Sequence, residues 1–240
     1  MGIERGEAFV LRIRDFAESD LIVTLFTEDW GKRTAIAKGA RRVKSRLGGV
    51  FDLLNRVEVV FYAKAQLDLV SQGAVISDYP HLKGSLDTVL AALSVGKLLD
   101  RLLPLHQQEP AAYTILARML AQLESGAPHG EQTTIAAMLK LFAVLGHRPQ
   151  LTACTRCGSR HGPFRFVPAR GGVVCLKCGE RGIDISRGFA LSLNALLDSP
   201  LSRAGIVRLG EGELSQAHEL IDSYLRELTG PNSGAVPTRE

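Results

Sequence analysis

The chain has few of the features that mark membrane or secreted proteins. None of its apolar runs approaches the roughly eighteen residues of a membrane span, and its first ten residues lack the basic-then-apolar pattern of a secretory signal. We therefore expect a cytoplasmic protein. Cysteine is also scarce, with four residues among 240. In a reducing compartment such cysteines more often bind a metal or do redox work than form permanent disulfides.

The sequence also lacks the common catalytic and nucleotide-binding motifs. It contains no G-x-x-x-x-G-K-[ST] phosphate loop, no GxGxxG after an expected strand, no HExxH and no GxSxG. An ATP-driven mechanism is therefore not expected. Acidic pairs such as Asp15 and Asp20 do not have a spacing that supports a nuclease site. These absences favour a protein that is not an enzyme.

The composition excludes a largely disordered chain, because 45% of the residues are hydrophobic and 22% are charged. The first third of the sequence consists of short runs rich in Val, Ile, Leu and Phe, several with alternating apolar and polar positions. The turn at residues 28–31 is tight enough for a hairpin. Five such strands suit a small closed β-barrel, which has no exposed sheet edges. The expected strands cover residues 7–16, 20–27, 32–39, 55–62 and 67–76.

The hydrophobic period changes from two toward 3.6 in the middle of the chain. Ser85 is expected to cap a helix that Pro104 ends, and Ser186 a short helix that ends before Pro200. Further helices are expected over residues 110–126, 131–146 and 212–230.

Together these patterns predict an α+β protein made of five segments. A β-barrel occupies residues 1–80, and a helical domain follows over residues 81–150. The cysteine segment covers residues 151–182, and C-terminal helices at 183–230 pack on the helical domain. A flexible tail is expected at residues 231–240.

The four cysteines form two CxxC pairs separated by seventeen residues. Each pair can supply two thiolates from one tight turn, and this spacing matches a four-thiolate zinc ribbon. The residues between the pairs suggest two short strands around a Gly-Gly turn, which would bring the pairs together. The sequence therefore predicts one structural Zn²⁺ ion, held by Cys154, Cys157, Cys175 and Cys178.

Other interpretations of the cysteines fit less well. A redox site needs only one CxxC pair, placed at the start of a helix, whereas this chain has two pairs that are each followed by glycine. A catalytic zinc keeps one coordination position open for water, and four thiolates close it. His161 lies nearby, but with four cysteines available a position in a surface loop fits it better.

Positive charge is concentrated in two segments, although the net charge is only +4. Residues 151–182 contain six Lys or Arg and a single acid. The other concentration follows the third expected strand and consists of Lys38, Arg41, Arg42, Lys44 and Arg46. A charge run is commonly a solvated loop, but on a small barrel it also suits a surface that follows phosphate groups. We expect a polyanionic partner.

Aromatic residues make up only 6% of the chain. Phe9, Phe26, Phe51 and Phe61 lie within or beside the apolar runs and are expected in the core. Trp30, in a turn, is the best candidate for an exposed ring on which a base could stack.

Several motifs also occur in an order found in one protein family. They are Glu18-Ser19-Asp20, Gly31-Lys32, the AKGARRVKSR run at 37–46, LLDRLLP at 98–104 and the LGHRPQLTACTRCG segment at 145–158. In combination they resemble the RecO family of bacterial DNA repair proteins. The resemblance implies an N-terminal OB-fold barrel, a helical bundle and a zinc-binding segment.

The resemblance also implies a function, namely a recombination mediator of the RecFOR pathway, associated with the nucleoid. Such a protein binds single- and double-stranded DNA and anneals complementary strands without ATP. With RecR it promotes RecA loading onto strands coated by single-strand-binding protein. Carried over by position, the expected DNA contacts are Lys32, Arg33, Lys38, Arg41, Arg42, Lys44 and Arg46.

Two functions of other classes remain as alternatives. One is a zinc-ribbon nucleic-acid-binding factor of transcription or translation, and the less favoured one is a zinc-dependent nucleic-acid hydrolase. An annealing assay without nucleotide or added metal separates these alternatives from a mediator, since cleavage marks the hydrolase and no effect favours the factor.

Overall fold

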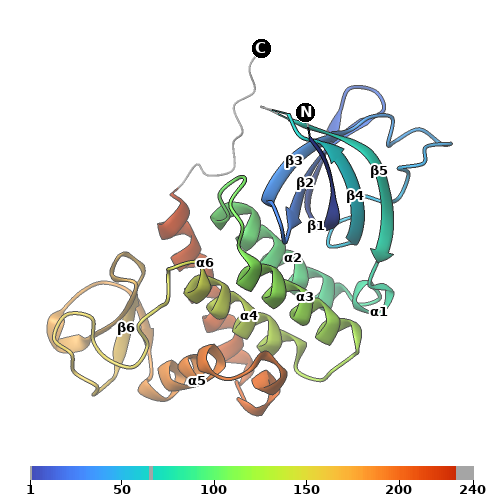
Figure 1. Cartoon of the computed structure of the whole chain (residues 1–240). Helices are drawn as coiled ribbons and strands as arrows, with labels where there is room; N and C mark the ends of the chain where they lie inside the picture. The colour runs from blue at the N-terminus through green and yellow to red at the C-terminus, as the bar shows by residue number, and fades with distance from the viewer. Residues whose placement is uncertain (1, 65–66, 231–240) are drawn as a thin grey trace. The chain divides into compact units, whose positions relative to one another are not determined.

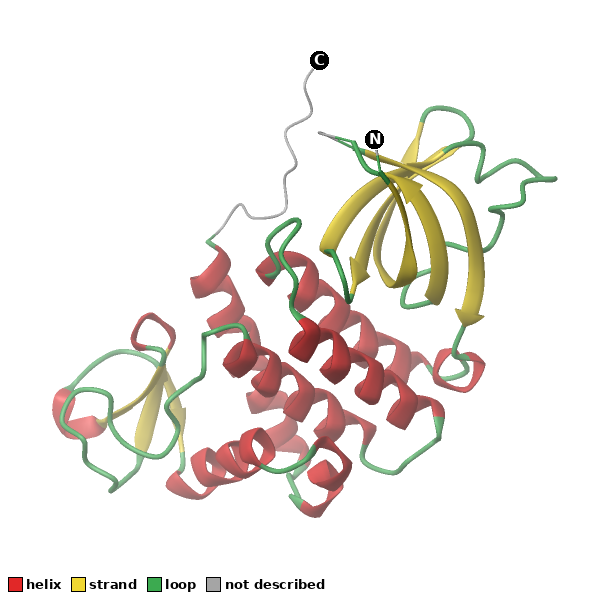
Figure 2. Cartoon of the chain, viewed as in Figure 1, coloured by secondary structure: helices red, strands yellow, loops and turns green. Residues whose placement is uncertain are grey.

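The computed structural model describes residues 2–64 and 67–230, and the chain divides into two compact units, Met1–Leu120 and Ala121–Glu240. The expected tail, residues 231–240, lies outside the described residues. The predicted fold class is confirmed, with a closed barrel and helices (Figures 1 and 2) and, among the described residues, one cluster of four cysteines. No described helix is both long and apolar enough to span a bilayer. The five expected segment boundaries stay a prediction.

The first unit begins with a closed five-stranded barrel in which neighbours follow the order β1-β2-β3-β5-β4. All pairs are antiparallel except β3 and β5, whose parallel pairing joins only Ala35 to Asp68 and Ile36 to Leu69. The sheet thereby closes on itself and hides its edges. The strands are β1 (Ile3–Phe16), β2 (Asp20–Thr27), β3 (Gly31–Ala37), β4 (Arg56–Tyr62) and β5 (Asp68–Ser77).

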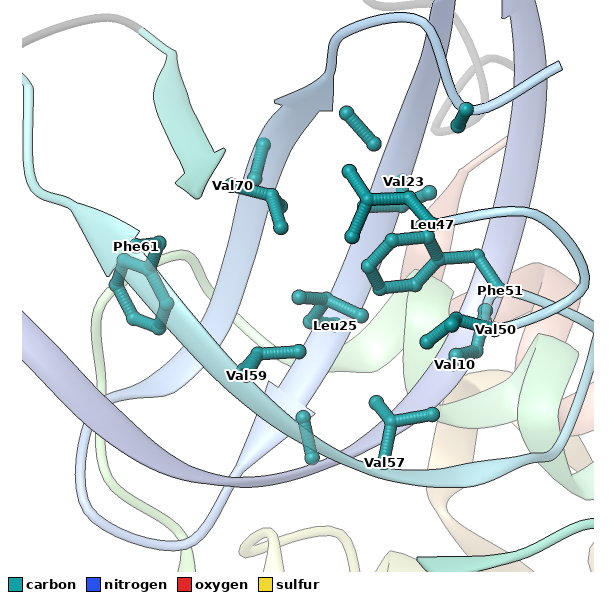
Figure 3. Close-up of a cluster of buried hydrophobic side chains, with 14 residues drawn as sticks. Val10, Val23, Leu25, Leu47, Val50, Phe51, Val57, Val59, Phe61 and Val70 are labelled. Carbon is teal, nitrogen blue, oxygen red and sulfur yellow. The ribbon is translucent and has the colours of Figure 1, made fainter. Parts of the chain in front are cut away.

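Apolar side chains fill the barrel from every strand and from the loop between β3 and β4 (Figure 3). Ala8 and Val10 of β1 belong to this core, whereas beyond the bulge at Leu11 it is Ile13 that packs against it. A bulge adds one residue and so reverses the face on which later side chains lie. The simple alternation suggested by the sequence of β1 is therefore interrupted.

Helices α1 (Pro80–Lys83), α2 (Leu86–Leu102) and α3 (Pro110–Glu124) follow the barrel, and α3 crosses the boundary between the units. Tyr113 places its ring 4.9 Å from Phe9 and 5.6 Å from Phe26, measured between centroids. The fully buried Phe9 therefore packs against α3. Ser85 is the N-cap residue of α2, as predicted, but its side chain makes no capping hydrogen bond.

The second unit contains α4, on which α5 and α6 pack, and a small three-stranded sheet in the order β7-β6-β8. The Ser186 hydroxyl accepts a hydrogen bond from the Phe189 amide at 3.0 Å, which confirms it as the cap of α5. The elements are α4 (Gly130–Val144), β6 (Phe164–Val167), η1 (Pro168–Arg170), β7 (Gly172–Cys175), η2 (Leu176–Cys178), β8 (Ile183–Ile185), α5 (Arg187–Asp198), η3 (Leu201–Ile206) and α6 (Glu211–Thr229).

The cysteine-bearing sheet, which we call the ribbon (residues 151–185), packs on α6 through Tyr224. The Tyr224 ring meets Phe166 edge-on at 5.6 Å, and its hydroxyl donates to the His147 carbonyl at 3.1 Å. Gln216 adds a hydrogen bond of 2.8 Å from its side-chain amide to the Asp184 carbonyl. The ribbon is thus fastened to the helices of its own unit.

Candidate nucleic-acid interface and metal centre

The loop between β3 and β4 has an apolar inner side and a basic outer side. Ala40, Leu47, Val50 and Phe51 are buried and belong to the barrel core (Figure 3). The charged side chains of the loop lie on its outer side, because on the inner side their charges would be buried in apolar surroundings. We call the exposed set the basic loop: Lys38, Arg41, Arg42, Lys44 and Arg46.

Hydrogen bonds hold the backbone of the basic loop. Successive turns form as the amides of Arg42 and Ser45 donate to the carbonyls of Gly39 and Arg42, at 3.1 and 2.9 Å. The end of the β1–β2 turn and the start of β2 supply two anchors: the Gly39 amide donates to the Asp20 carboxylate at 2.7 Å, and the Arg41 amide donates to the Ser19 carbonyl at 2.9 Å. The positive side chains therefore extend from a defined backbone.

The charges of the basic loop are largely open to solvent. Arg41 forms an ion pair of 3.2 Å with Asp15, but both side chains are exposed, and such pairs contribute at most about 1 kcal/mol. Arg42 donates to the Ser19 hydroxyl at 3.3 Å. Val43 is fully exposed among these cations. Asp15 and Asp20 thus contact the loop, Asp15 through the Arg41 side chain and Asp20 through the Gly39 amide.

Lys32 is placed differently from the basic loop, because it is buried with an exposed fraction of 9%. Its Nζ donates to the Asp100 carbonyl at 2.5 Å and lies 3.9 Å from the Asp100 carboxylate. Burial lowers the pKa of Lys32, Asp100 opposes that shift, and nearby Arg12 adds to it. Next to it, a side chain on Gly31 would collide with the Gln107 carbonyl. The Lys32 side chain therefore holds β3 to the end of α2, and Gly31 leaves room for Gln107, next to which the His106 amide donates to the Lys32 carbonyl at 2.9 Å.

Arg33 is also buried, and its charge is compensated inside the barrel. Its Nε donates to Asp68 at 2.7 Å, and its guanidinium lies 3.4 Å from Glu4. The guanidinium carbon also lies 5.1 Å from the centroid of the Phe61 ring. Of the seven residues expected to contact DNA, Lys32 and Arg33 are thus held in the protein, and the five of the basic loop are exposed.

Trp30 is not an exposed platform, so that interpretation was wrong. Its ring meets Phe61 edge-on at 5.6 Å and packs against the barrel core. A side chain at Gly6 would collide with the indole, so the ring lies directly over the β1 backbone. From the sequence Trp30 could be assigned to a turn, but it was not evident that Gly6 lies opposite and leaves room for the ring.

The structure brings the four cysteines together. The Sγ atoms of Cys154, Cys157, Cys175 and Cys178 all lie within 4.8 Å of one another, with three of the separations at 3.6, 3.6 and 3.9 Å. Tetrahedral thiolates at a Zn–S distance of about 2.3 Å would be about 3.8 Å apart. The cluster can therefore hold a metal ion in a four-thiolate site.

Local backbone structure makes this cluster possible. Phe164 pairs with Cys175 across the antiparallel β6–β7 ladder, which positions the second CxxC pair. Each pair ends in a glycine with positive φ, +73° at Gly158 and +71° at Gly179, a conformation that favours glycine. His161 is exposed and does not belong to the cluster found among the described residues.

The thiols differ in their tendency to ionise. Burial works against the Cys154 thiolate, but hydrogen bonds from the backbone of both CxxC turns outweigh it and lower the pKa to about 6. Hydrogen bonding with Cys157 and Cys175 favours the protonated Cys178 thiol and, together with burial, raises the pKa of Cys178 to about 12. Four adjacent thiolates repel one another, so a cation is what would keep all of them deprotonated together.

Comparison with protein families shows to which family the chain is related. A family model described as "Recombination protein O C terminal" matches residues 83–234, and one described as "Recombination protein O N terminal" matches residues 1–79. The chain belongs to the RecO family of DNA repair proteins. The similarity expected from its motifs is thereby confirmed.

Individual RecO relatives are similar along most of their length. The DNA repair protein RecO of Symbiobacterium thermophilum is 35% identical over 236 residues, which cover 95% of this chain and 93% of the relative. The DNA repair protein RecO of Desulfitobacterium hafniense is 36% identical over 223 residues, with 92% and 78% covered. RecO family membership supports a role in DNA repair and recombination.

Proposed function

We propose that this RecO-family protein is a recombination mediator of the RecFOR pathway that binds single- and double-stranded DNA and anneals complementary strands without ATP. The basic loop carries this proposal. Its five exposed cationic side chains extend from a hydrogen-bonded backbone on the barrel. Such side chains can contact the phosphates of a DNA strand without a fixed spacing between the contacts.

The mechanism requires charge neutralisation and no covalent step. Two strands repel each other through their phosphates, and a basic surface that binds them reduces this repulsion. Base pairing then supplies the free energy of annealing. Because the contacts are to phosphates, binding should depend on salt and little on base sequence.

We propose that the metal is one Zn²⁺ ion with a structural role and that the protein is not an enzyme. The four cysteines would hold the ion in a closed shell, and zinc supplies folding free energy to such sites. A shell of four thiolates offers no position for an activated water. The metal would therefore act by joining the two CxxC turns of the ribbon.

RecR and single-strand-binding protein are the proposed partners, and together with RecR the protein would promote RecA loading onto coated strands. Family membership supports this part of the proposal, as it does a cytoplasmic, nucleoid-associated location. Recovery of RecR and single-strand-binding protein with the tagged chain from cells would test it.

An annealing assay tests the central proposal. Complementary oligonucleotides, one of them fluorescent, are mixed with the purified protein without nucleotide or added metal. We expect faster annealing with intact strands. Cleavage would instead indicate a hydrolase, and unchanged annealing would favour the zinc-ribbon factor of transcription or translation.

A further inference from the structure

A groove of about 450 Å³ lies between the ribbon and α6 within the second unit. The ribbon lines it with the end of β6, the start of η1 and Arg181, and α6 lines it with Ser223, Arg226 and Glu227. We call the apolar part of its lining, Val167, Pro168 and Ala169, the floor of the groove, and Val167 is buried.

Arg181 and Arg226 are exposed, and among the described residues neither forms an ion pair. They differ in this from most arginines of the ribbon. Arg156 and Arg170 both pair with Glu180, at 3.4 and 3.0 Å, so that one carboxylate serves two guanidinium groups.

Arg165 is also held, because it pairs with Asp184 at 2.7 Å. Arg156 also donates to the Cys178 carbonyl at 3.3 Å, and its charge would offset the net negative charge of a zinc ion held by four thiolates. Several ribbon arginines therefore stabilise the ribbon itself. The cations that remain for an external anion are Arg160, Lys177 and Arg181 on the ribbon and Arg226 on α6.

We propose that this groove is a second DNA site, in which Arg181 and Arg226 bind phosphates of a single strand while the apolar floor contacts its sugars and bases. The inference rests on the proposed function and deepens it. An open groove lined by one arginine of the ribbon and one of α6 suits a flexible polyanion, whose phosphates can reach both guanidinium groups. The site lies in a different unit from the basic loop, so one molecule would hold two strands for annealing.

Glu227 lines the same groove and gives the proposal a signature. A carboxylate beside a bound phosphate repels it, so removal of that charge strengthens DNA binding if DNA enters the groove. Glu219 lies on the same helix, is exposed and does not line the groove. Glu219→Gln is therefore a control with the same change in net charge.

The test compares R181A/R226A with R203A/R208A, which removes two exposed arginines elsewhere in the same unit. Affinity for a fluorescent single strand is measured over a range of salt concentrations. We expect the slope of log affinity against log salt to become shallower by about 1.4 in R181A/R226A, because each phosphate contact to a single strand contributes about 0.7. The slope of R203A/R208A should equal that of the wild type, and E227Q should bind more tightly than E219Q.

The outcomes separate this inference from the proposed function. Wild-type protein that neither binds nor anneals strands would overturn both. Wild-type annealing with equal slopes for R181A/R226A and R203A/R208A, or equal affinity for E227Q and E219Q, would overturn the groove alone. An acidic peptide that occupies the groove without competing with DNA would also overturn it. If R181A/R226A loses metal or fold, the E227Q and E219Q pair still decides.

Discussion

The basic loop and the ribbon are the two most basic segments of the chain, yet they use their charge differently. The two segments have the same excess of positive charge in sequence, six cations to one acid over residues 151–182 and five cations to no acid over residues 38–46. In the ribbon, much of this excess is nevertheless taken up by Glu180 and Asp184. The basic loop keeps its five side chains exposed, because its anchors are backbone bonds to Ser19 and Asp20.

A second contrast lies within a few residues of the same strand. Lys32 and Arg33 are buried in compensating contacts, and Lys38 is exposed beyond the end of β3. Charge count in a sequence therefore gives an upper limit on the charge available to a polyanion. The available part depends on which carboxylates and carbonyls the fold brings within reach.

The largest effect is expected from Cys175→Ser, which tests whether a bound metal stabilises the ribbon. Structural zinc in small peptides contributes on the order of 10 kcal/mol to folding, so the ribbon should unfold locally. Metal content should fall well below one ion per chain, and proteolysis should cut within the ribbon. His161→Ala should keep its metal. Full metal content in the cysteine variant would contradict the site.

Asp68→Ala tests the buried side of the second contrast. Removing one partner of a buried ion pair leaves an uncompensated charge and costs about 3–5 kcal/mol. Asp68 is 1% exposed and also accepts a hydrogen bond from the Lys64 amide at 2.9 Å. Denaturant unfolding should show this loss, while Arg41→Ala should change stability by at most about 1 kcal/mol. Equal stability of the two variants would show that the Arg33 pair is unimportant.

Replacement of Arg41, Arg42 and Lys44 by Ala tests the exposed side. Three lost phosphate contacts should make the salt slope for a single strand shallower by about 2, whatever the base sequence. The five contacts of the full basic loop should contribute roughly −3 to −4 to the slope of log affinity against log salt. K97A/R118A/R203A has the same loss of charge and serves as the control. A loss that depends on base sequence would mean that the loop reads bases.

The smallest effect, and the most specific, is expected for Asp20. Asp20→Ala removes a negative charge, so electrostatics alone would strengthen DNA binding. We expect about fivefold weaker binding instead, since the lost hydrogen bond to Gly39 contributes about 1 kcal/mol to loop order. Asp20→Asn keeps an acceptor oxygen and should bind at least as tightly as the wild type. Tighter binding by the Ala variant would show that the anchor has no role.

Much of the fold could be predicted from local pattern. Alternation and turn residues indicated all five barrel strands, and the 3.6-residue period indicated the long helices. Strand β8 was missed because three residues are too few to show a period. The β1 bulge was missed because it depends on pairing with β2, which the sequence of β1 does not contain.

The site was predictable where ligands are close in sequence and chemically distinctive. The two CxxC pairs indicated their own cluster. The burial of Arg33 could not be seen, because its partner Asp68 lies 35 residues away and the two meet only when the barrel closes. The role of Asp20 could not be predicted for the same reason. From the sequence, an acid near a basic loop is expected to repel DNA, not to accept a hydrogen bond from the loop backbone.

The parallel β3–β5 pairing determines how much of the chain must be synthesised before the barrel can close. The barrel cannot close before Asp68 and Leu69 have been made, but every barrel contact described above is formed by residues before 121. The second CxxC pair is translated more than fifty residues later. Closure of the barrel would therefore not depend on a metal bound by the ribbon, and we expect chains made without metal to keep a folded N-terminal unit.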